Sequence, residues 1–243
     1  MKLNRLNKLS RLITGILLLL SSASLFATPI VITDSSQLDF EGDFVFALNF
    51  FGSSDVSIGD ANFDNVAVRI GSNPNGFSMT GFNRNTSWSA GSDIGTGANN
   101  DALESILSTI VWSGEVRMGA MSFDLLSGHR YKVQLLFSEC CDNRNFSITS
   151  SDGQFYEEYQ GGNWKSSTTQ GYLSTWDFVA TDTGLNLDFQ RMQVPGGDSN
   201  YHISGLTIEQ LSQQDPITPV SAPSTMSILG IALLGLLCRR RKH

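Results

Sequence analysis

Cysteine and histidine are scarce in this sequence of 243 residues, which contains three of each. One of each lies in the last six residues, so the body keeps only Cys140, Cys141, His129 and His202. A metal site needs more ligands at suitable spacing, so no metal centre is expected. Neither body histidine lies near a serine in a nucleophile-elbow context, and we therefore do not expect an enzyme.

Long apolar runs are also missing. Near the N-terminus, Leu12 to Leu20 is a run of nine residues, whereas a spanning helix needs roughly 17 to 25. Four basic residues precede this run, and Leu25-Phe26-Ala27 follows it after small and polar residues. This layout predicts a secretory signal peptide over residues 1–27, cleaved after Ala27. An uncleaved membrane anchor is the alternative.

The C-terminal end combines an apolar stretch with a basic tail. The stretch Met226 to Cys238 has 13 residues and is followed at once by Arg239, Arg240, Arg241 and Lys242. Its length is marginal for a transmembrane helix, which takes about 20 residues, and the basic flank would hold that end in the cytoplasm. Such a segment would tether the chain.

These C-terminal residues resemble a sorting signal. V-S-A-P-S-T at 220–225, the apolar stretch and the basic tail follow in the order of the PEP-CTERM signal of Gram-negative bacteria. Ser221-Ala222-Pro223 stands where that family has Pro-Glu-Pro. The resemblance implies a sorting segment at 224–243, passage through the inner membrane, and an exosortase-type enzyme that releases or transfers the protein to the cell surface. Residues 212–223, rich in proline, serine and glutamine, read as a linker.

Positive charge is rare in the body of the chain. All 23 acidic residues lie between positions 28 and 223, whereas 8 of the 16 basic residues lie in the two ends, which leaves the body a formal charge of −15. Such a body repels nucleic acid and anionic membrane surfaces. Neutral glycans are the easier partner.

Alternating apolar and polar residues dominate the body. Tyr131, Val133, Leu135 and Phe137 alternate with mostly polar residues, which predicts a core strand because successive side chains of a strand point to opposite faces. Many similar segments separated by polar turns predict an all-β sandwich formed by one domain, residues 28–211.

Two segments depart from this alternation. Asp101 and Glu104 form a capping-box-like start, and apolar residues follow at helical spacing, which predicts a short helix. Gly71 to Gly97 is rich in glycine, asparagine and serine. A segment this long is expected to be a functional or floppy loop.

Several motifs of the body resemble malectin and malectin-like domains. Leu126-Ser127-Gly128 followed by YKVQLLFSE is similar to the family's central signature, HISGLTIEQ at 202–210 to its closing strand, and ALNFFG at 47–52 to its opening. The resemblance covers most of residues 44–210. It implies a jelly-roll, galactose-binding-like sandwich that binds glycans in loops at one end.

Candidate binding residues lie in polar segments with aromatic residues. Sugar rings present apolar faces and hydroxyl edges, so a binding loop needs aromatic platforms beside amide and carboxylate groups. For each aromatic residue, packing in the core is the alternative. The segment Glu139 to Asn145 between two core strands is the first place to look. The candidates are Trp88, with its neighbours 83–85, and Asp142, Asn143, Arg144, Tyr159, Asn163 and Trp164.

The body also contains a cysteine pair, two adjacent glutamates and several aspartates, and each has both a functional and a simpler structural explanation. Cys140 and Cys141 are expected to form a disulfide that stiffens their segment in an oxidising compartment, with a reactive thiol pair as the alternative. Glu157 and Glu158 are adjacent, so on a strand they would point to opposite faces, which is unsuitable for the paired carboxylates of a glycosidase. Ca²⁺ is the only ion that the aspartates at 182, 188 and 198 suggest, and a solvated acidic surface explains them as well.

The sequence thus predicts an exported, surface-sorted protein that binds carbohydrate and is associated with an extracellular polysaccharide matrix. A structural matrix or adhesion module without a ligand pocket is the alternative, and a glycan-active hydrolase a weaker one.

Overall fold

The computed structural model describes residues 29–66, 73–87, 94–114, 117–138, 144–160, 171–192 and 199–212. The expected signal peptide, all but the first residue of the expected linker, and the sorting segment with its apolar stretch lie outside the described residues. Among the described residues, no helix has the length and apolar character needed to cross a membrane. The body up to Gln210 forms one compact unit.

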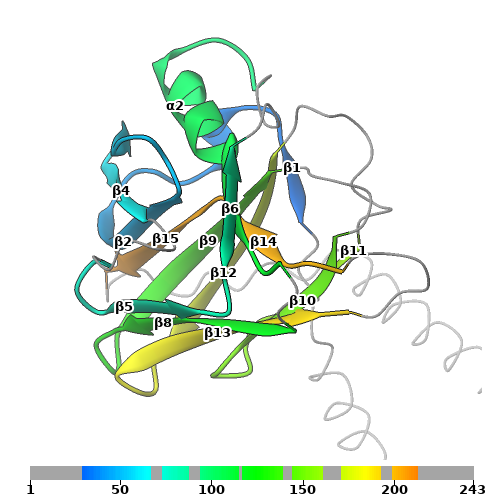
Figure 1. Cartoon of the computed structure of the whole chain (residues 1–243). Coiled ribbons are helices and arrows are strands. Elements are labelled where there is room, and N and C mark those ends of the chain that lie inside the picture. Colours follow the sequence, from blue (N-terminus) through cyan, green and yellow to red (C-terminus); the bar gives the residue numbers. More distant parts are fainter. Residues whose placement is uncertain are drawn as a thin grey trace, which may run out of the picture. The chain divides into compact units, whose positions relative to one another are not determined.

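The described elements are nearly all strands (Figure 1). In chain order they are β1 (Ile30–Ile32), the 3-10 helix η2 (Ser35–Gln37), β2 (Asp43–Phe50), β3 (Val56–Ile58), β4 (Ala61–Val66), β5 (Phe77–Thr80), β6 (Arg84–Ser87), α2 (Ala98–Leu107), β7 (Thr109–Trp112), β8 (Met118–Asp124), β9 (Arg130–Ser138), β10 (Asn145–Ser150), β11 (Tyr156–Gln160), β12 (Gly171–Val179), β13 (Gly184–Arg191), β14 (His202–Ile203) and β15 (Gly205–Leu211). The prediction of an all-β fold with one short α-helix is confirmed for the described residues.

Two large sheets and one small sheet build the sandwich. The first has the order β1-β12-β9-β15-β2-β4-β3, the second β11-β10-β13-β8-β5, and the small one β14-β7-β6. β2 and β4 pair in parallel, whereas β12 pairs antiparallel with β1 and β9, β15 with β2, and β10 with β13. Figure 1 shows the second sheet crossing below the long strands of the first. The main core joins apolar residues of both large sheets, including Phe137 of β9 and Phe146 of β10.

The central strand β9 is as predicted. Tyr131, Val133, Leu135 and Phe137 are all buried in the main core. Leu136, on the opposite face of the strand, is buried too, in a second core that also contains Leu103, Ile106 and Leu107 of α2. Both faces of the first sheet are therefore covered, one by the second sheet and part of the other by the helix.

The helix begins differently from the prediction. Its N-cap is Gly97, which forms no side-chain cap, and α2 starts at Ala98. The Glu104 carboxylate instead accepts a hydrogen bond from the backbone N–H of Ile94 at 2.9 Å. The predicted helix therefore exists, but the predicted capping box at its start is wrong. Its apolar spacing, not its cap, carried the prediction.

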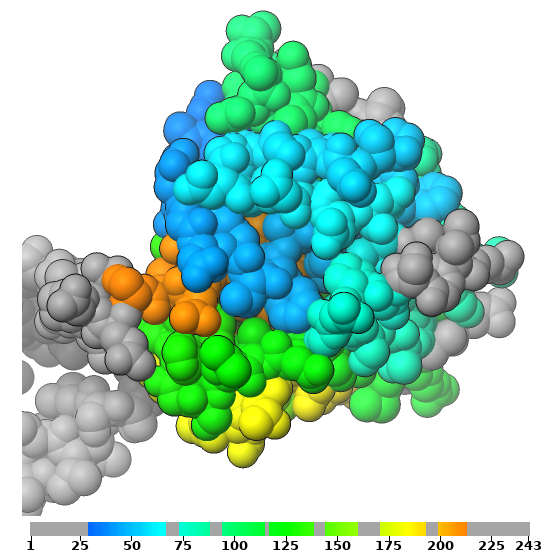
Figure 2. Space-filling view, turned by 90° about the vertical axis from the view of Figure 1, so that its left-hand side faces the viewer, coloured from blue at the N-terminus to red at the C-terminus, as the bar shows by residue number. Residues whose placement is uncertain are grey.

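The segment 71–97 contains two strands that the prediction of one long loop missed. β5 pairs with β8 and β6 pairs with β7, and both Phe77 and Phe82 are buried in the main core. Figure 2 shows how the early strands, in blue and cyan, lie side by side over one face of the molecule. The short strand β3 (Val56–Ile58) was not predicted either.

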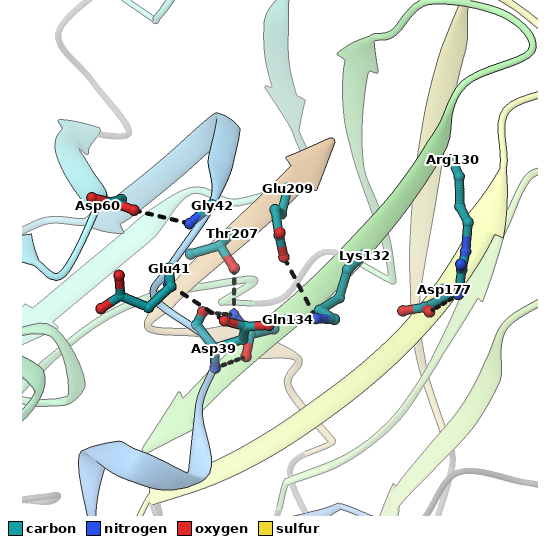
Figure 3. Close-up of polar contacts among 10 residues, drawn as sticks. All are labelled: Asp39, Glu41, Gly42, Asp60, Arg130, Lys132, Gln134, Asp177, Thr207 and Glu209. Carbon is teal, nitrogen blue, oxygen red and sulfur yellow. Dashed lines mark hydrogen bonds and ion pairs between the residues drawn. The ribbon is translucent and has the colours of Figure 1, made fainter. Parts of the chain in front are cut away.

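A polar cluster lies on the outer face of the first sheet (Figure 3). Gln134 of β9 accepts a hydrogen bond from the Asp39 N–H at 2.8 Å and donates to the Asp39 carbonyl at 2.6 Å and to the Thr207 hydroxyl at 2.9 Å. Lys132 lies 2.5 Å from the Asp39 carboxylate and 3.5 Å from that of Glu209. These contacts fasten the segment that precedes β2 to β9 and β15.

Candidate ligand-binding site at the Ser138 end

Three segments of the chain begin and end at the same end of the sandwich. Ser138, the last residue of β9, pairs with Gly171, the first of β12. Asn145 pairs with Gln160. The Met192 N–H donates to the carbonyl of Asn145 at 2.9 Å. The described residues that flank segments 139–143 and 161–170, together with Met192, therefore lie at the same end of the sandwich, which we call the Ser138 end.

Arg144 and Trp112 are stacked at this end. Arg144 directly precedes β10 and is only 9% exposed, and its guanidinium carbon lies 5.0 Å from the centroid of the Trp112 ring. Trp112 ends β7 and is partly exposed. A planar guanidinium over an indole face is a favourable cation–π arrangement, worth more where the pair is shielded from water.

An amide holds this pair in place. The Asn200 amide lies 3.3 Å from Ser113 Oγ, next to Trp112, and 3.3 Å from Arg144 Nη1. With the amide turned so that its oxygen faces the guanidinium, it accepts from Arg144 and its nitrogen donates to Ser113. Arg84 and Asn85 of β6 lie alongside, because they pair with Trp112 and Val111. The fold thus brings a guanidinium, an indole and an amide together, which are the groups that bind sugar hydroxyls and ring faces.

His202 lies under this pair as a structural residue. It is fully buried, and its Nε2 lies 3.0 Å from the Ser138 carbonyl, to which it donates as a neutral imidazole. Burial, together with the nearby charge of Arg144, lowers its pKa to about 3, although the bond to Ser138 acts in the opposite direction. A histidine that stays neutral at ordinary pH and lies inside the core serves to connect β14 with β9.

Tyr159 is a core residue and not an open sugar platform. Its ring is fully buried and stacks on Phe146 with 4.6 Å between centroids. Its hydroxyl donates to Glu157 Oε2 at 2.6 Å and lies 2.9 Å from Ser174 Oγ on β12. The ring thus cannot stack on a sugar at the surface. It packs the edge strand β11 into the core and joins it to the first sheet through Ser174.

Glu157 is a carboxylate whose burial was not predicted. It is 2% exposed, whereas its neighbour Glu158 is exposed, so the two do point to opposite faces as expected. Burial raises the pKa of Glu157 to about 7, against the hydrogen bonds from Ser174 and Tyr159, which lower it. The sequence does contain a pattern that indicates this burial. Glu157 alternates with the aromatic residues Phe155 and Tyr159 at period two, so all three share one strand face.

Of the predicted site residues, only Arg144 and Tyr159 belong to the described chain. The others lie outside the described residues: Trp88, Asp142, Asn143, Asn163 and Trp164, and likewise Cys140 and Cys141. Four of these five ligand candidates and both cysteines belong to segments attached at the Ser138 end. Trp112 and Asn200 were missed as site residues because only the pairing of β6, β7 and β14 brings them beside Arg144. In the described parts of the chain, no group of three or more histidine, cysteine, aspartate or glutamate residues could hold a metal ion.

Comparison with known proteins identifies the fold. No family model and no curated protein sequence matches the chain. Solved structures do match, among them the plant receptor FER in complex with the peptide RALF23 and LLG2 (18% identity, 71% of this chain and 50% of that chain, TM-score 0.56). The ANX2 ectodomain from Arabidopsis thaliana has 12% identity over 70% of this chain and 50% of that chain, with a TM-score of 0.54.

The fold is malectin-like. A third structure, the ANXUR1 extracellular domain from Arabidopsis thaliana, agrees at 13% identity, 70% of this chain, 48% of that chain and a TM-score of 0.53. The chain spans about half the length of these structures. The predicted jelly-roll sandwich is thus confirmed at the level of the fold.

Proposed function

We propose that this chain is an exported binding module that recognises glycan at the Ser138 end of its malectin-like sandwich. The observation that supports the proposal is that Arg144 stacks on Trp112 at the end of the sandwich where the described residues flanking segments 139–143 and 161–170 lie. Those two segments contain four of the predicted ligand residues, namely Asp142, Asn143, Asn163 and Trp164. The fold resembles extracellular domains of receptors, and a rigid sandwich with long segments at one end is a common way to present a ligand site.

The proposed location follows from the two ends of the chain. The signal-peptide pattern of residues 1–27 and the PEP-CTERM-like pattern of residues 220–243 support export, contact with an exosortase-type enzyme and display at the cell surface. The acidic body favours a glycan or exopolysaccharide partner that is not strongly anionic. A vicinal disulfide between Cys140 and Cys141 would lower the entropy cost of ordering the segment beside Arg144 when a ligand binds.

A glycan array probed with the full-length protein is the first test, followed by titration calorimetry with the best glycan. Arg144→Ala is expected to weaken binding about tenfold, since a charge-assisted hydrogen bond contributes about 1.5–3 kcal/mol. Arg130→Ala is the matched control, because Arg130 forms an exposed ion pair with Asp177 at the opposite end of β9.

Circular dichroism and thermal melting of each variant show whether it remains folded. If the array detects no glycan, the chain is a structural or adhesion module instead. If Arg144→Ala and Arg130→Ala bind equally well, the site does not lie at the Ser138 end.

A further inference from the structure

A groove of about 570 Å³ lies at the other end of the sandwich. It is formed by the end of β8, the turn after β10, the end of β12 and the turn that leads into β13. Because Val179 of β12 pairs with Arg130 and Gly171 with Ser138, this end is separated from the Ser138 end by the length of β9, about 26 Å at 3.3 Å per residue. The groove shares no residue with the site proposed above, and its volume is typical of ligand pockets.

The residues that line this groove select for a ligand rich in hydrogen-bond donors. Its charged residues are all acidic, namely Asp124, Asp152 and Asp182, and its lining includes no lysine, arginine or histidine. Most of the remaining polar groups are hydroxyls, with the amide of Asn186 among them. Carboxylates only accept hydrogen bonds when ionised, so they suit vicinal sugar hydroxyls or an ammonium group and repel an acidic ligand.

Hydrogen bonds hold the walls of the groove in place before any ligand binds. Asp152 Oδ1 accepts from the Gln154 N–H at 3.0 Å and from the Ser150 hydroxyl at 2.5 Å. The turn after β10 is tied to β13, because Asn186 N–H donates to Ser151 Oγ at 3.0 Å and Ser151 N–H donates to the Asn186 carbonyl at 2.8 Å. On the other side, the Ser127 hydroxyl donates to the Thr181 carbonyl at 2.9 Å. A preformed groove loses less conformational entropy when a ligand binds.

We infer that this groove is a second ligand site and that it takes a sugar without acidic groups, either neutral or carrying an amine. The exposed carboxylates of Asp124 and Asp182 would accept hydrogen bonds from the ligand, while the anchored Asp152 would set its orientation. Uronic acids and sulfated sugars are excluded by charge.

The test is titration of the full-length protein with three probes: cello-oligosaccharide, chitosan oligosaccharide and oligogalacturonate. The double variant Asp124→Ala/Asp182→Ala is compared with Asp188→Ala, an exposed aspartate of β13 outside the groove. We expect the double variant to weaken binding of the neutral or the amino sugar at least tenfold, and Asp188→Ala to stay within twofold of the wild type. A preference for the chitosan probe that salt abolishes would show that the ligand carries an amine.

Binding in the Arg144→Ala background separates the two sites, because a groove ligand should bind there as it does in the wild type. Nuclear magnetic resonance shifts confined to residues 181–186 would locate the ligand directly. The inference is overturned if neither neutral nor amino sugar binds, if the folded double variant keeps wild-type affinity, or if oligogalacturonate binds the groove more tightly than the other probes.

Discussion

Glu157 is an acid whose charged form the fold disfavours. Its pKa rises from an ordinary value of 4.5 to about 7, because burial outweighs the hydrogen bonds from Ser174 and Tyr159. A raised carboxyl pKa means that the folded state binds more protons than the unfolded state between these two values. The contribution of Glu157 to the free energy of unfolding is therefore highest below pH 4.5 and falls as pH rises towards 7, by up to about 3 kcal/mol.

Glu157→Gln should stabilise the protein at pH 8. Glutamine has the shape of the protonated acid, keeps an oxygen that accepts from the Tyr159 hydroxyl, and never ionises. We expect urea unfolding at pH 8 to give a free energy of unfolding about 1–3 kcal/mol above that of the wild type. Glu158→Gln, one residue along on the exposed face, serves as the control and should change the stability by less than about 0.5 kcal/mol. A variant at position 157 that is less stable at pH 8 would show that the ionised carboxylate contributes a favourable interaction.

For single residues, the sequence predicts which side chains are buried better than it predicts their partners. Period-two alternation correctly placed Tyr131 and Phe137 in the core and separated Glu157 from Glu158. It did not reveal that Ser174 of β12 lies 2.9 Å from the Tyr159 hydroxyl, because the alternation describes one strand face and not what packs against it. That contact depends on how the two sheets pack, which short patterns do not contain.

At the scale of elements, strands with strong alternation were predictable and strands held mainly by their neighbours were not. β9 and β13 are recognisable from their apolar period. β5 and β6 have four residues each in a glycine- and asparagine-rich segment, and only pairing with β8 and β7 makes them strands. For the same reason the groove at the far end of the sandwich, built from four separate elements, could not be predicted.

Gln134 is the side chain that attaches the segment before β2 to the sheet. It is buried, and its amide forms three hydrogen bonds with Asp39 and Thr207 (Figure 3). Gln134→Ala removes all three bonds, so the free energy of unfolding should drop by about 2–3 kcal/mol. The matched control is Gln190→Ala, an exposed residue of β13, expected to stay within about 0.5 kcal/mol. Equal urea midpoints for both variants would mean that the Gln134 bonds add nothing to stability.

For the whole molecule, the two proposed sites lie at opposite ends of the sandwich. The Ser138 end receives the segments with the predicted ligand residues, and the opposite end holds the acidic groove. Two sites separated by the length of a strand would let one copy of the chain bind two glycan strands at once, which suits a protein proposed to lie in a polysaccharide matrix. Avidity of this kind needs no new contact, only simultaneous access to both sites.

Two buried groups with opposite responses should shape the pH dependence of stability. His202 has its pKa lowered from 6.5 to about 3, so the unfolded state binds the extra proton, and stability falls as pH drops below 6.5. Glu157 acts in the reverse direction between 4.5 and about 7. Between pH 4.5 and 6.5 the two effects are of similar size, about 1.4 kcal/mol per pH unit each, and cancel.

The contribution of this pair to stability should therefore be level from about pH 4.5 to 6.5 and fall on either side. In Glu157→Gln only the His202 effect remains, so the free energy of unfolding should rise steadily from pH 4.5 to 6.5, by up to about 2–3 kcal/mol relative to the wild-type profile. Urea unfolding of both proteins at half-unit steps from pH 4 to 8 measures the difference directly. Because the two proteins share every other titrating group, subtracting the profiles isolates Glu157. Parallel profiles would show that its carboxyl group titrates alike in the folded and unfolded states, contrary to its burial beside Tyr159.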